Sequence, residues 1–371
     1  MDKPDLPDSP VLGLNSNLLS AHEEGRARAF SPGHTTKMHV DVDGQKRTAE
    51  VHVPQGWDGK SALPTLYYFK ALKPGAPEPE SFTGLSQAAD KAGVAVVYLH
   101  GEGLLNSYNN GQRDFGRSWW SALTGTKDGP DENKYLNAVH DKLSTRLPLD
   151  ASRQGLTGFS HGGSEAYALA SQNNWVSSVQ SDEGYMTGYE KPLNRPMSQQ
   201  TIHALHDPVI PYGGTEQVGR IADKEAENDM EMSKYSGEPF IDLKFLFHYL
   251  EYNHEKNGNM IQDQKYIVDA YNRANGLVDP KTGKAGDPAV TQRGDITTRS
   301  WVNTANGAET RQVILGTGTH GWAGSIDHRG DIAVIGIPNE TFNASEAMLD
   351  FLKKHPLIDV SAKPVETQPA P

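Results

Sequence analysis

The sequence Gly158-Phe159-Ser160-His161-Gly162-Gly163 matches the pattern G-x-S-x-G and adds one more glycine. A short strand-like run, residues 153–157, precedes it, and residues 164–170 behind it are rich in good helix formers. A serine at such a strand-to-helix turn is held in a strained backbone conformation, and the glycines leave room where side chains would collide. We therefore predict that Ser160 is a nucleophile and that the backbone amide of His161 faces a developing oxyanion.

A serine hydroxyl needs a histidine to accept its proton and an acid to orient that histidine. In hydrolases with this kind of turn the chain order is serine, acid, histidine, and each partner follows a later strand. Asp207 follows the strand-like run 200–205, and His320 follows the run 311–315 within a glycine-rich stretch. The sequence thus predicts a triad of Ser160, Asp207 and His320, whereas an ordinary glycine-rich turn requires neither partner.

Other histidines compete for the role of base or for a metal ion. The side chain of His161 points away from the position that a general base needs, and His203 and His206 precede Asp207 in the chain. A zinc site of His203, His206 and Asp207 is disfavoured because positions 203 and 206 on an extended strand face opposite sides. His328 stays a serious rival for the base, and we predict no metal site.

A second oxyanion donor is expected from the loop after the strand at residues 65–69, where the sequence reads Lys70-Ala71-Leu72. We favour the amides of Ala71 and Leu72 for this role. The segment His100-Gly101-Glu102-Gly103 is a rival, but it follows the next strand along the chain.

Hydrophobic runs separated by a helical stretch predict the fold class. Residues 65–69 and 94–99 are near-continuous apolar runs, typical of strands buried on both faces, and residues 82–91 between them are helical in pattern. Strand, helix, strand is a βαβ unit, so we expect an α/β fold with a mainly parallel central sheet flanked by helices. Further elements are expected as an Asp43-Gly44 hairpin, a helix at 131–146, strands at 176–181, 200–205 and 311–315, and a final helix from Asn343 to Lys354.

Two regions near the end of the chain are harder to place. Residues 215–275 are charged and helical in pattern, and they form either an insertion beside the site or extra helices on the far side of the sheet. Residues 276–299, rich in Gly, Asp, Lys and Pro, are expected to form a loop. We predict an N-terminal tail at 1–33, a catalytic domain at 34–356, and a disordered tail at 357–371.

Composition narrows the classes of partner. The chain has 371 residues, a net charge of −12 and no cysteine. The acidic balance argues against nucleic acid or an anionic membrane as the main partner, and the lack of cysteine excludes disulfides and a cysteine nucleophile. No apolar run is long enough for a membrane span, which favours a soluble protein. A secreted or periplasmic form without its leader fits equally well, and the oligomeric state is left open.

Several of these motifs together resemble one family. From about residue 38 to 355 the chain resembles the polyhydroxybutyrate depolymerase-like esterases, the α/β-hydrolase family that also holds feruloyl and acetylxylan esterases. The motifs that carry the resemblance are Gly158 to Gly163, His203-Ala204-Leu205-His206-Asp207 with Ile210-Pro211-Tyr212, Gly318 to Gly324, and Asn343-Ala344-Ser345-Glu346. The resemblance implies an α/β-hydrolase fold, Ser160 as nucleophile, Asp207 as acid and His320 as base, and Trp322 as a wall of the substrate site.

Three features depart from the family pattern. Lys70-Ala71-Leu72 replaces the family's H-G-C oxyanion segment, the bracing cysteines of many relatives are missing, and the stretch at 215–275 is longer. Tyr212, Trp119 and Trp120 are, with Trp322, expected to be exposed aromatics that hold the substrate.

The expected activity is ester hydrolysis without a cofactor, on a hydroxyalkanoate polyester or oligomer. A feruloyl or acetylxylan esterase is the alternative substrate class, and a peptidase on the same scaffold is a third activity. A catalytically silent hydrolase fold used for binding is the alternative of another class.

Overall fold

A computed structural model describes residues 30–71, 79–101, 119, 131–188, 190–207, 209–214, 261–325 and 336–359. Several sequence predictions therefore fall outside the described residues: Leu72, Trp120, His328, most of the two predicted tails and most of the 215–275 stretch. Within the described part, no helix has the length and apolar character needed to cross a membrane.

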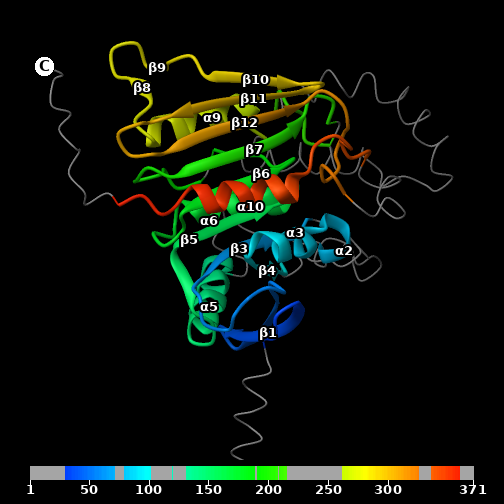
Figure 1. The fold of residues 1–371 in the computed structure, drawn as a ribbon. Coiled ribbons are helices and arrows are strands. Elements are labelled where there is room, and N and C mark those ends of the chain that lie inside the picture. The colour runs from blue at the N-terminus through cyan, green and yellow to red at the C-terminus, as the bar shows by residue number, and fades with distance from the viewer. Residues whose placement is uncertain are drawn as a thin grey trace, which may run out of the picture.

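A ten-stranded sheet crosses the whole molecule in the order β1-β2-β4-β3-β5-β6-β7-β12-β11-β10 (Figure 1). Its centre, from β4 through β3, β5, β6 and β7 to β12, is parallel, and antiparallel strands lie at both edges. The strands are β1 His34–Val42, β2 Gln45–Val53, β3 Leu63–Phe69, β4 Ala95–Leu99, β5 Leu149–Gly158, β6 Ser178–Asp182, β7 Ser198–Ala204, β10 Ala289–Arg293, β11 Ile296–Val302 and β12 Glu309–Leu315, with a separate pair, β8 Val278–Asp279 and β9 Lys284–Ala285.

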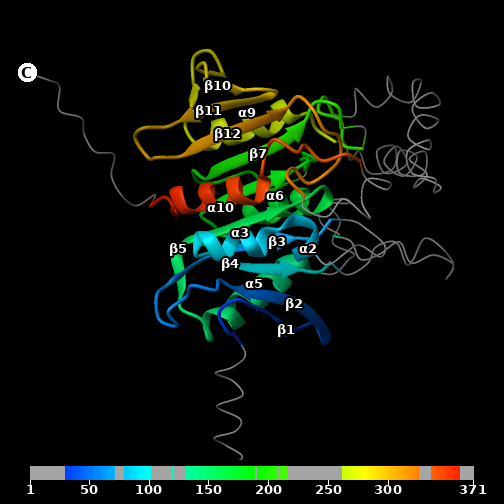
Figure 2. The same cartoon turned by 45° about the vertical axis from the view of Figure 1, so that its right-hand side comes forward.

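Helices cover both faces of this sheet (Figures 1 and 2). On one face α3 and α10 lie side by side, and their apolar residues share a core with the strands beneath them. On the other face α5, α6 and α9 contribute to a second core. The helices are α2 Pro79–Thr83, α3 Leu85–Ala92, α5 Glu132–Ser144, α6 His161–Ala170, α9 Gln264–Ala274 and α10 Ala344–Lys354.

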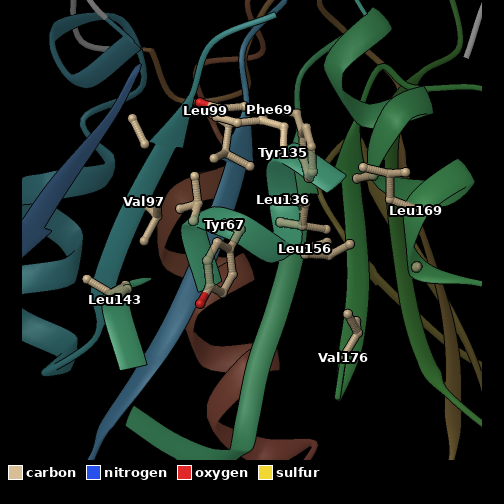
Figure 3. Close-up of a cluster of buried hydrophobic side chains, with 14 of the residues drawn as sticks. Tyr67, Phe69, Val97, Leu99, Tyr135, Leu136, Leu143, Leu156, Leu169 and Val176 are labelled. Carbon is tan, nitrogen blue, oxygen red and sulfur yellow. The ribbon is translucent and has the colours of Figure 1, made fainter. Parts of the chain in front are cut away.

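Strand β3 shows why the central strands read as continuous apolar runs. Tyr67 and Phe69 face the core shared with α5, α6 and α9, whereas Leu66 and Tyr68 face the core shared with α3 and α10. All four side chains are buried because successive residues of a strand point to opposite faces, and both faces are covered. Figure 3 shows Tyr67 and Phe69 from β3 packed with Val97 and Leu99 of β4 and with residues of the covering helices.

The predicted α/β-hydrolase fold is confirmed. The predicted βαβ unit is β3, α2 with α3, and β4, and the Asp43-Gly44 hairpin joins β1 to β2. Asn343 caps α10 as expected, since its Oδ1 accepts the Glu346 amide at 2.9 Å. The strand-to-helix turn that holds Ser160 joins the central strand β5 to α6.

The prediction of a loop at 276–299 is wrong. The chain forms β8, β9, β10 and the start of β11 there, and Gly294-Asp295 is the two-residue turn between β10 and β11. Strands β8 and β9 pair only with each other, β10 is the edge strand of the large sheet with β11 next to it, and every residue of β10 is exposed. Without a buried face they carry no hydrophobic alternation, which is the signal by which strands are read from sequence.

The described part of the 215–275 stretch is α9, which buries Ile267 and Tyr271 in the core beneath α5 and α6. This helix therefore covers the sheet, while residues 215–260 of the stretch lie outside the described residues.

A buried ion pair joins the N-terminal strands to α5. Arg47 of β2 is 2% exposed, and its Nη2 lies 2.8 Å from Oε2 of Glu132, the first residue of α5. The same nitrogen donates to the carbonyl oxygen of His100 at 3.0 Å, and the guanidinium carbon lies 3.9 Å from the centre of the Tyr135 ring.

Replacing Glu132 by leucine removes the carboxylate that lies 2.8 Å from the buried Arg47 guanidinium. We expect this change to lower the free energy of unfolding by about 3–5 kcal/mol, measured by denaturant unfolding. The matched control is the double variant Arg47→Met with Glu132→Leu, which removes both charges and should lose less than the single variant. If the double variant lost as much free energy of unfolding as the single variants Glu132→Leu and Arg47→Met together, the two side chains would not be coupled.

Candidate active site

Ser160 occupies a strained turn between β5 and α6. Its backbone angles are φ 55° and ψ −127°, outside the regions that L-residues ordinarily adopt. Its amide donates to the carbonyl oxygen of Asp182 at 2.9 Å, which ties the turn to the end of β6. The sequence prediction of a sharp, strained turn at this serine is confirmed.

The glycines around Ser160 are required by close packing. A Cβ added at Gly158 would lie 2.3 Å from the carbonyl carbon of Gly162, and one at Gly162 would lie 2.0 Å from the carbonyl oxygen of Phe69. Both are well inside the 3.0 Å below which real Cβ atoms are essentially never found. The first turn of α6 therefore lies directly against the ends of β5 and β3.

The structure brings Ser160, His320 and Asp207 into one hydrogen-bonded chain. His320 Nε2 lies 2.8 Å from Ser160 Oγ, and His320 Nδ1 lies 2.7 Å from Asp207 Oδ2. Since the carboxylate can only accept, Nδ1 carries the proton and Nε2 is free to accept the proton of the serine hydroxyl. This geometry can transfer the Ser160 proton to His320 while Asp207 holds the imidazole in the required tautomer.

Asp207 is an anion held from several directions. Its Oδ1 accepts the amides of Val209 at 2.7 Å and Ile210 at 2.9 Å. Burial acts to raise the pKa of Asp207, but the charge and hydrogen bond of His320, with further contacts, keep that pKa below its usual value. Asp207 therefore remains ionised opposite His320 at neutral pH.

The loop that carries His320 is fixed by contacts on both sides. The amide of Thr319 donates to the Ile337 carbonyl oxygen at 2.7 Å, and the amide of Ala323 donates to Asp182 Oδ2 at 2.8 Å. The ring of Phe159, next to the serine, lies 5.1 Å from the His320 ring between centroids. Asp182, at the end of β6, thus accepts hydrogen bonds from Ser160 and from the loop that carries His320.

The side chain of His161 is buried and turned away from the serine hydroxyl. Its Nε2 donates to the Trp119 carbonyl oxygen at 2.8 Å, which leaves Nδ1 to accept the Tyr185 hydroxyl at 3.2 Å. Its backbone amide begins α6, and the first amides of a helix have no carbonyl partner within that helix. The amide is therefore the part of His161 that can serve an oxyanion.

The predicted second oxyanion segment lies next to this amide. Ala71 follows β3 and is half-buried, and the carbonyl oxygens of Phe69 and Lys70 border the space at Gly162. The Lys70 carbonyl oxygen also accepts the indole N–H of Trp119 at 2.6 Å, which fixes the chain just before Ala71. Ala71 is thus placed beside the start of α6, while its companion Leu72 lies outside the described residues.

The expectation that Trp322 and Trp119 are exposed is wrong. Trp322 is 0% exposed, its Nε1 donates to Ser345 Oγ at 3.1 Å, and its ring packs edge-on against Tyr68. Trp119 is 1% exposed, with its indole N–H on Lys70 as above. Each indole is buried with its one polar atom satisfied internally, so neither ring is a substrate wall. Tyr212 is half-buried with its ring 6.0 Å from that of His203, and Trp120 lies outside the described residues.

Sequence reasoning missed two buried carboxyl groups, Asp182 and Glu183, at the end of β6. Burial raises the pKa of both well above the usual values, with the charge of Asp207 adding to the effect. The signal was available, because Asp182-Glu183-Gly184 directly follows the predicted strand at 176–181, at the same sheet edge as Ser160.

Glu183, His203 and Asp207 place one potential metal-ligand atom each within 4.8 Å of one another. The donor set does not fit a metal ion. His203 Nε2, the nitrogen that faces the carboxyl groups, donates to the Ile210 carbonyl oxygen at 2.8 Å and so has no lone pair to offer. The zinc trio that the sequence already disfavoured, His203, His206 and Asp207, includes one buried and one exposed histidine, because His203 lies within β7 and His206 lies in the turn that follows it.

Comparisons with known proteins point to esterases. Over 337 residues the chain is 26% identical to "Putative esterase NocK" of Nocardia uniformis subsp. tsuyamanensis, covering 88% of this chain and 84% of that protein. No family model matches the chain.

Solved structures give weaker likenesses. An S-formylglutathione hydrolase of Agrobacterium tumefaciens matches with a TM-score of 0.38 and 15% identity, covering 47% of this chain and 76% of that chain. An S-formylglutathione hydrolase of Staphylococcus aureus matches with a TM-score of 0.36 and 13% identity, covering 53% of this chain and 88% of that chain.

Burial of His161 predicts a pH effect on stability. Burial lowers the pKa of His161 from 6.5 to about 4 in the folded protein, although its bond to Trp119 acts against this shift. As the pH falls from about 6.5 to about 4, the unfolded chain takes up a proton at this residue and the folded chain does not, so stability is lost in that window. The loss attributable to His161 should approach about 3 kcal/mol.

The comparison variant is His161→Gln, whose amide can replace both side-chain hydrogen bonds but does not titrate. Denaturant unfolding at several pH values should show the wild type losing stability relative to this variant below pH 6.5. Parallel curves for the two proteins would contradict the assignment.

Proposed function

We propose that this protein is a serine hydrolase that cleaves carboxylic esters through an acyl-enzyme, with Ser160, His320 and Asp207 as the catalytic triad. The observation that carries the proposal is the continuous hydrogen-bonded chain from Ser160 Oγ through both His320 nitrogens to Asp207 Oδ2. Residues 34–356 are proposed to form the catalytic domain, and no cofactor takes part.

The reaction follows from the positions of these groups. Ser160 Oγ attacks the ester carbonyl carbon while His320 Nε2 takes its proton, and Asp207 stabilises the imidazolium that forms. The amides of His161 and of Ala71 or Leu72 stabilise the tetrahedral oxyanion. His320 then passes the proton to the leaving alcohol, and water releases the acyl group by the same steps in reverse order.

Two observations favour esters over peptides. The relative named above is described as an esterase, and the sequence motifs resemble the polyhydroxybutyrate depolymerase-like esterases. We propose a hydroxyalkanoate oligomer or polyester as the substrate class, with feruloyl and acetylxylan esters as the alternative. Four aromatic residues were expected at the substrate site. Among those that the structure describes, Tyr212 is the one that is partly exposed, and it lies five residues after Asp207.

Fluorophosphonate labelling tests the proposed nucleophile. The wild type should be labelled, and Ser160→Ala should not be labelled because no other described group lies against His320 Nε2. His320→Ala should lose at least about 10³-fold in kcat, whereas His328→Ala should retain most of it. An unlabelled wild type would instead support a catalytically silent binding protein, and loss of activity in His328→Ala alone would reassign the base.

A panel of esters tests the proposed substrate class. Hydroxybutyrate oligomers should be cleaved with a higher kcat/KM than feruloyl esters, acetylated sugars or a peptide anilide, with p-nitrophenyl butyrate as the reference. The Ser160→Ala variant is the control for uncatalysed hydrolysis on every substrate. A preference for the feruloyl or acetyl esters would replace the hydroxyalkanoate assignment, and a preference for the anilide would make the protein a peptidase.

A further inference from the structure

Glu183 lies directly behind the hydrogen-bonded chain of the proposed triad. It is 0% exposed and has a φ of 53°, a left-handed conformation that costs a non-glycine residue about 1–3 kcal/mol. Its amide donates to the Ile202 carbonyl oxygen at 3.0 Å, and the carbonyl of the preceding residue, Asp182, accepts the Ser160 amide. The strained residue Glu183 therefore directly follows Asp182, the residue whose carbonyl oxygen holds the Ser160 amide.

The strained backbone directs the Glu183 side chain towards β7 and the loop that follows it. Both of its carboxyl oxygens accept the Ala204 amide, at 3.0 and 3.2 Å, and its Oε2 lies 3.3 Å from His203 Nε2. One oxygen of its carboxyl group lies within 4.8 Å of a carboxylate oxygen of Asp207, and His203 Nε2 lies 3.3 Å from Glu183 Oε2 and 3.7 Å from Asp207 Oδ2. Glu183 thus lies beside the acid of the proposed triad, on the side away from solvent.

One of these two carboxyl groups must hold a proton, because two adjacent buried carboxylates repel each other strongly. Asp207 is the better anion, since it accepts two backbone amides and the His320 N–H. Glu183 accepts a single backbone amide, and the His203 N–H is directed to the Ile210 carbonyl oxygen. Glu183 therefore keeps the proton and is placed to donate a hydrogen bond to the Asp207 carboxylate.

We propose that Glu183 is a positioning residue, whose neutral carboxyl group donates a hydrogen bond that holds the Asp207 carboxylate against His320. The proposal rests on the proposed function, because it concerns the acid of that triad. It explains the strained backbone at Glu183, since a relaxed conformation would turn the carboxyl group away from Asp207.

A neutral donor positions Asp207 without adding a second negative charge near His320. The titratable groups around Glu183 are Asp182 on β6, His203 on β7, Asp207 on the following loop and His320 beyond β12. Burial raises the pKa of Asp182 and of Glu183 and lowers that of His203, so burial favours the neutral form of all three groups. The charge that His320 faces on this side is that of Asp207.

Three substitutions at Glu183 separate this role from a structural one. Glu183→Gln keeps a neutral donor for Asp207 and an acceptor for the Ala204 amide, so its kcat for p-nitrophenyl butyrate should stay within about threefold of wild type. Glu183→Met removes the donor, and Glu183→Asp withdraws it by one methylene. Both should lower kcat by about 10- to 100-fold with KM unchanged.

The pH profile of kcat/KM gives a second readout. Its acidic limb should have the same apparent pKa in wild type and Glu183→Gln, because neither side chain carries a charge at this position. If Glu183 were ionised, its replacement by glutamine would remove a negative charge beside His320 and lower that apparent pKa. Such a shift, or full kcat in Glu183→Met or Glu183→Asp, would overturn the proposal.

Controls keep this result separate from the proposed function. Thermal unfolding and near-UV circular dichroism identify variants that do not fold, and if Glu183→Met is one of them, Glu183→Asp decides the comparison. A wild type that is not labelled by fluorophosphonate refutes the proposed function itself. A labelled wild type with undiminished Glu183→Asp turnover refutes only the role of Glu183.

Discussion

The first turn of α6 lies in direct contact with the ends of β3 and β5, and the rest of the site depends on that contact. Gly162 meets the Phe69 carbonyl oxygen where any side chain would collide, and Gly158 meets the backbone of Gly162 in the same way. This packing forces Ser160 into its positive φ and exposes the hydroxyl to His320. It also places the first amides of α6 beside Ala71, so the proposed nucleophile and the proposed oxyanion donors are positioned by the same contact.

Strand β6 ends at Asp182, and the two buried acidic residues Asp182 and Glu183 link the separate parts of the site. The Asp182 carbonyl holds the Ser160 amide, and the Asp182 carboxyl group holds the amide of Ala323 in the loop that carries His320. Glu183 holds the amide of Ala204 at the end of β7. Burial raises the pKa of Asp182 and of Glu183, whereas the pKa of Asp207, the group with the most donors, stays below its usual value, so Asp207 is the group that best holds a negative charge.

Much of the fold was predictable because its central strands are buried on both faces. Apolar runs such as residues 65–69 and 94–99 indicate that burial directly. Asp43-Gly44 predicts its hairpin because these two residues favour a tight turn. Strand β10 was missed because it is an exposed edge strand, and β11 beside it is at most half-buried, so neither carries such a pattern. The burial of Trp322 was also misjudged, since it depends on Tyr68 and Ser345, which are distant in sequence.

The sequence by itself determined the strained serine turn, the order serine, acid, histidine, and the strands that carry them. These features are local, because close steric contacts and the burial of neighbouring residues are imposed within a few positions of the chain. Only the tertiary structure decided that His320 reaches both Ser160 and Asp207 and that Glu183 stands behind Asp207. Those contacts join residues up to 160 positions apart, and they exist because the parallel strands end at one edge of the sheet.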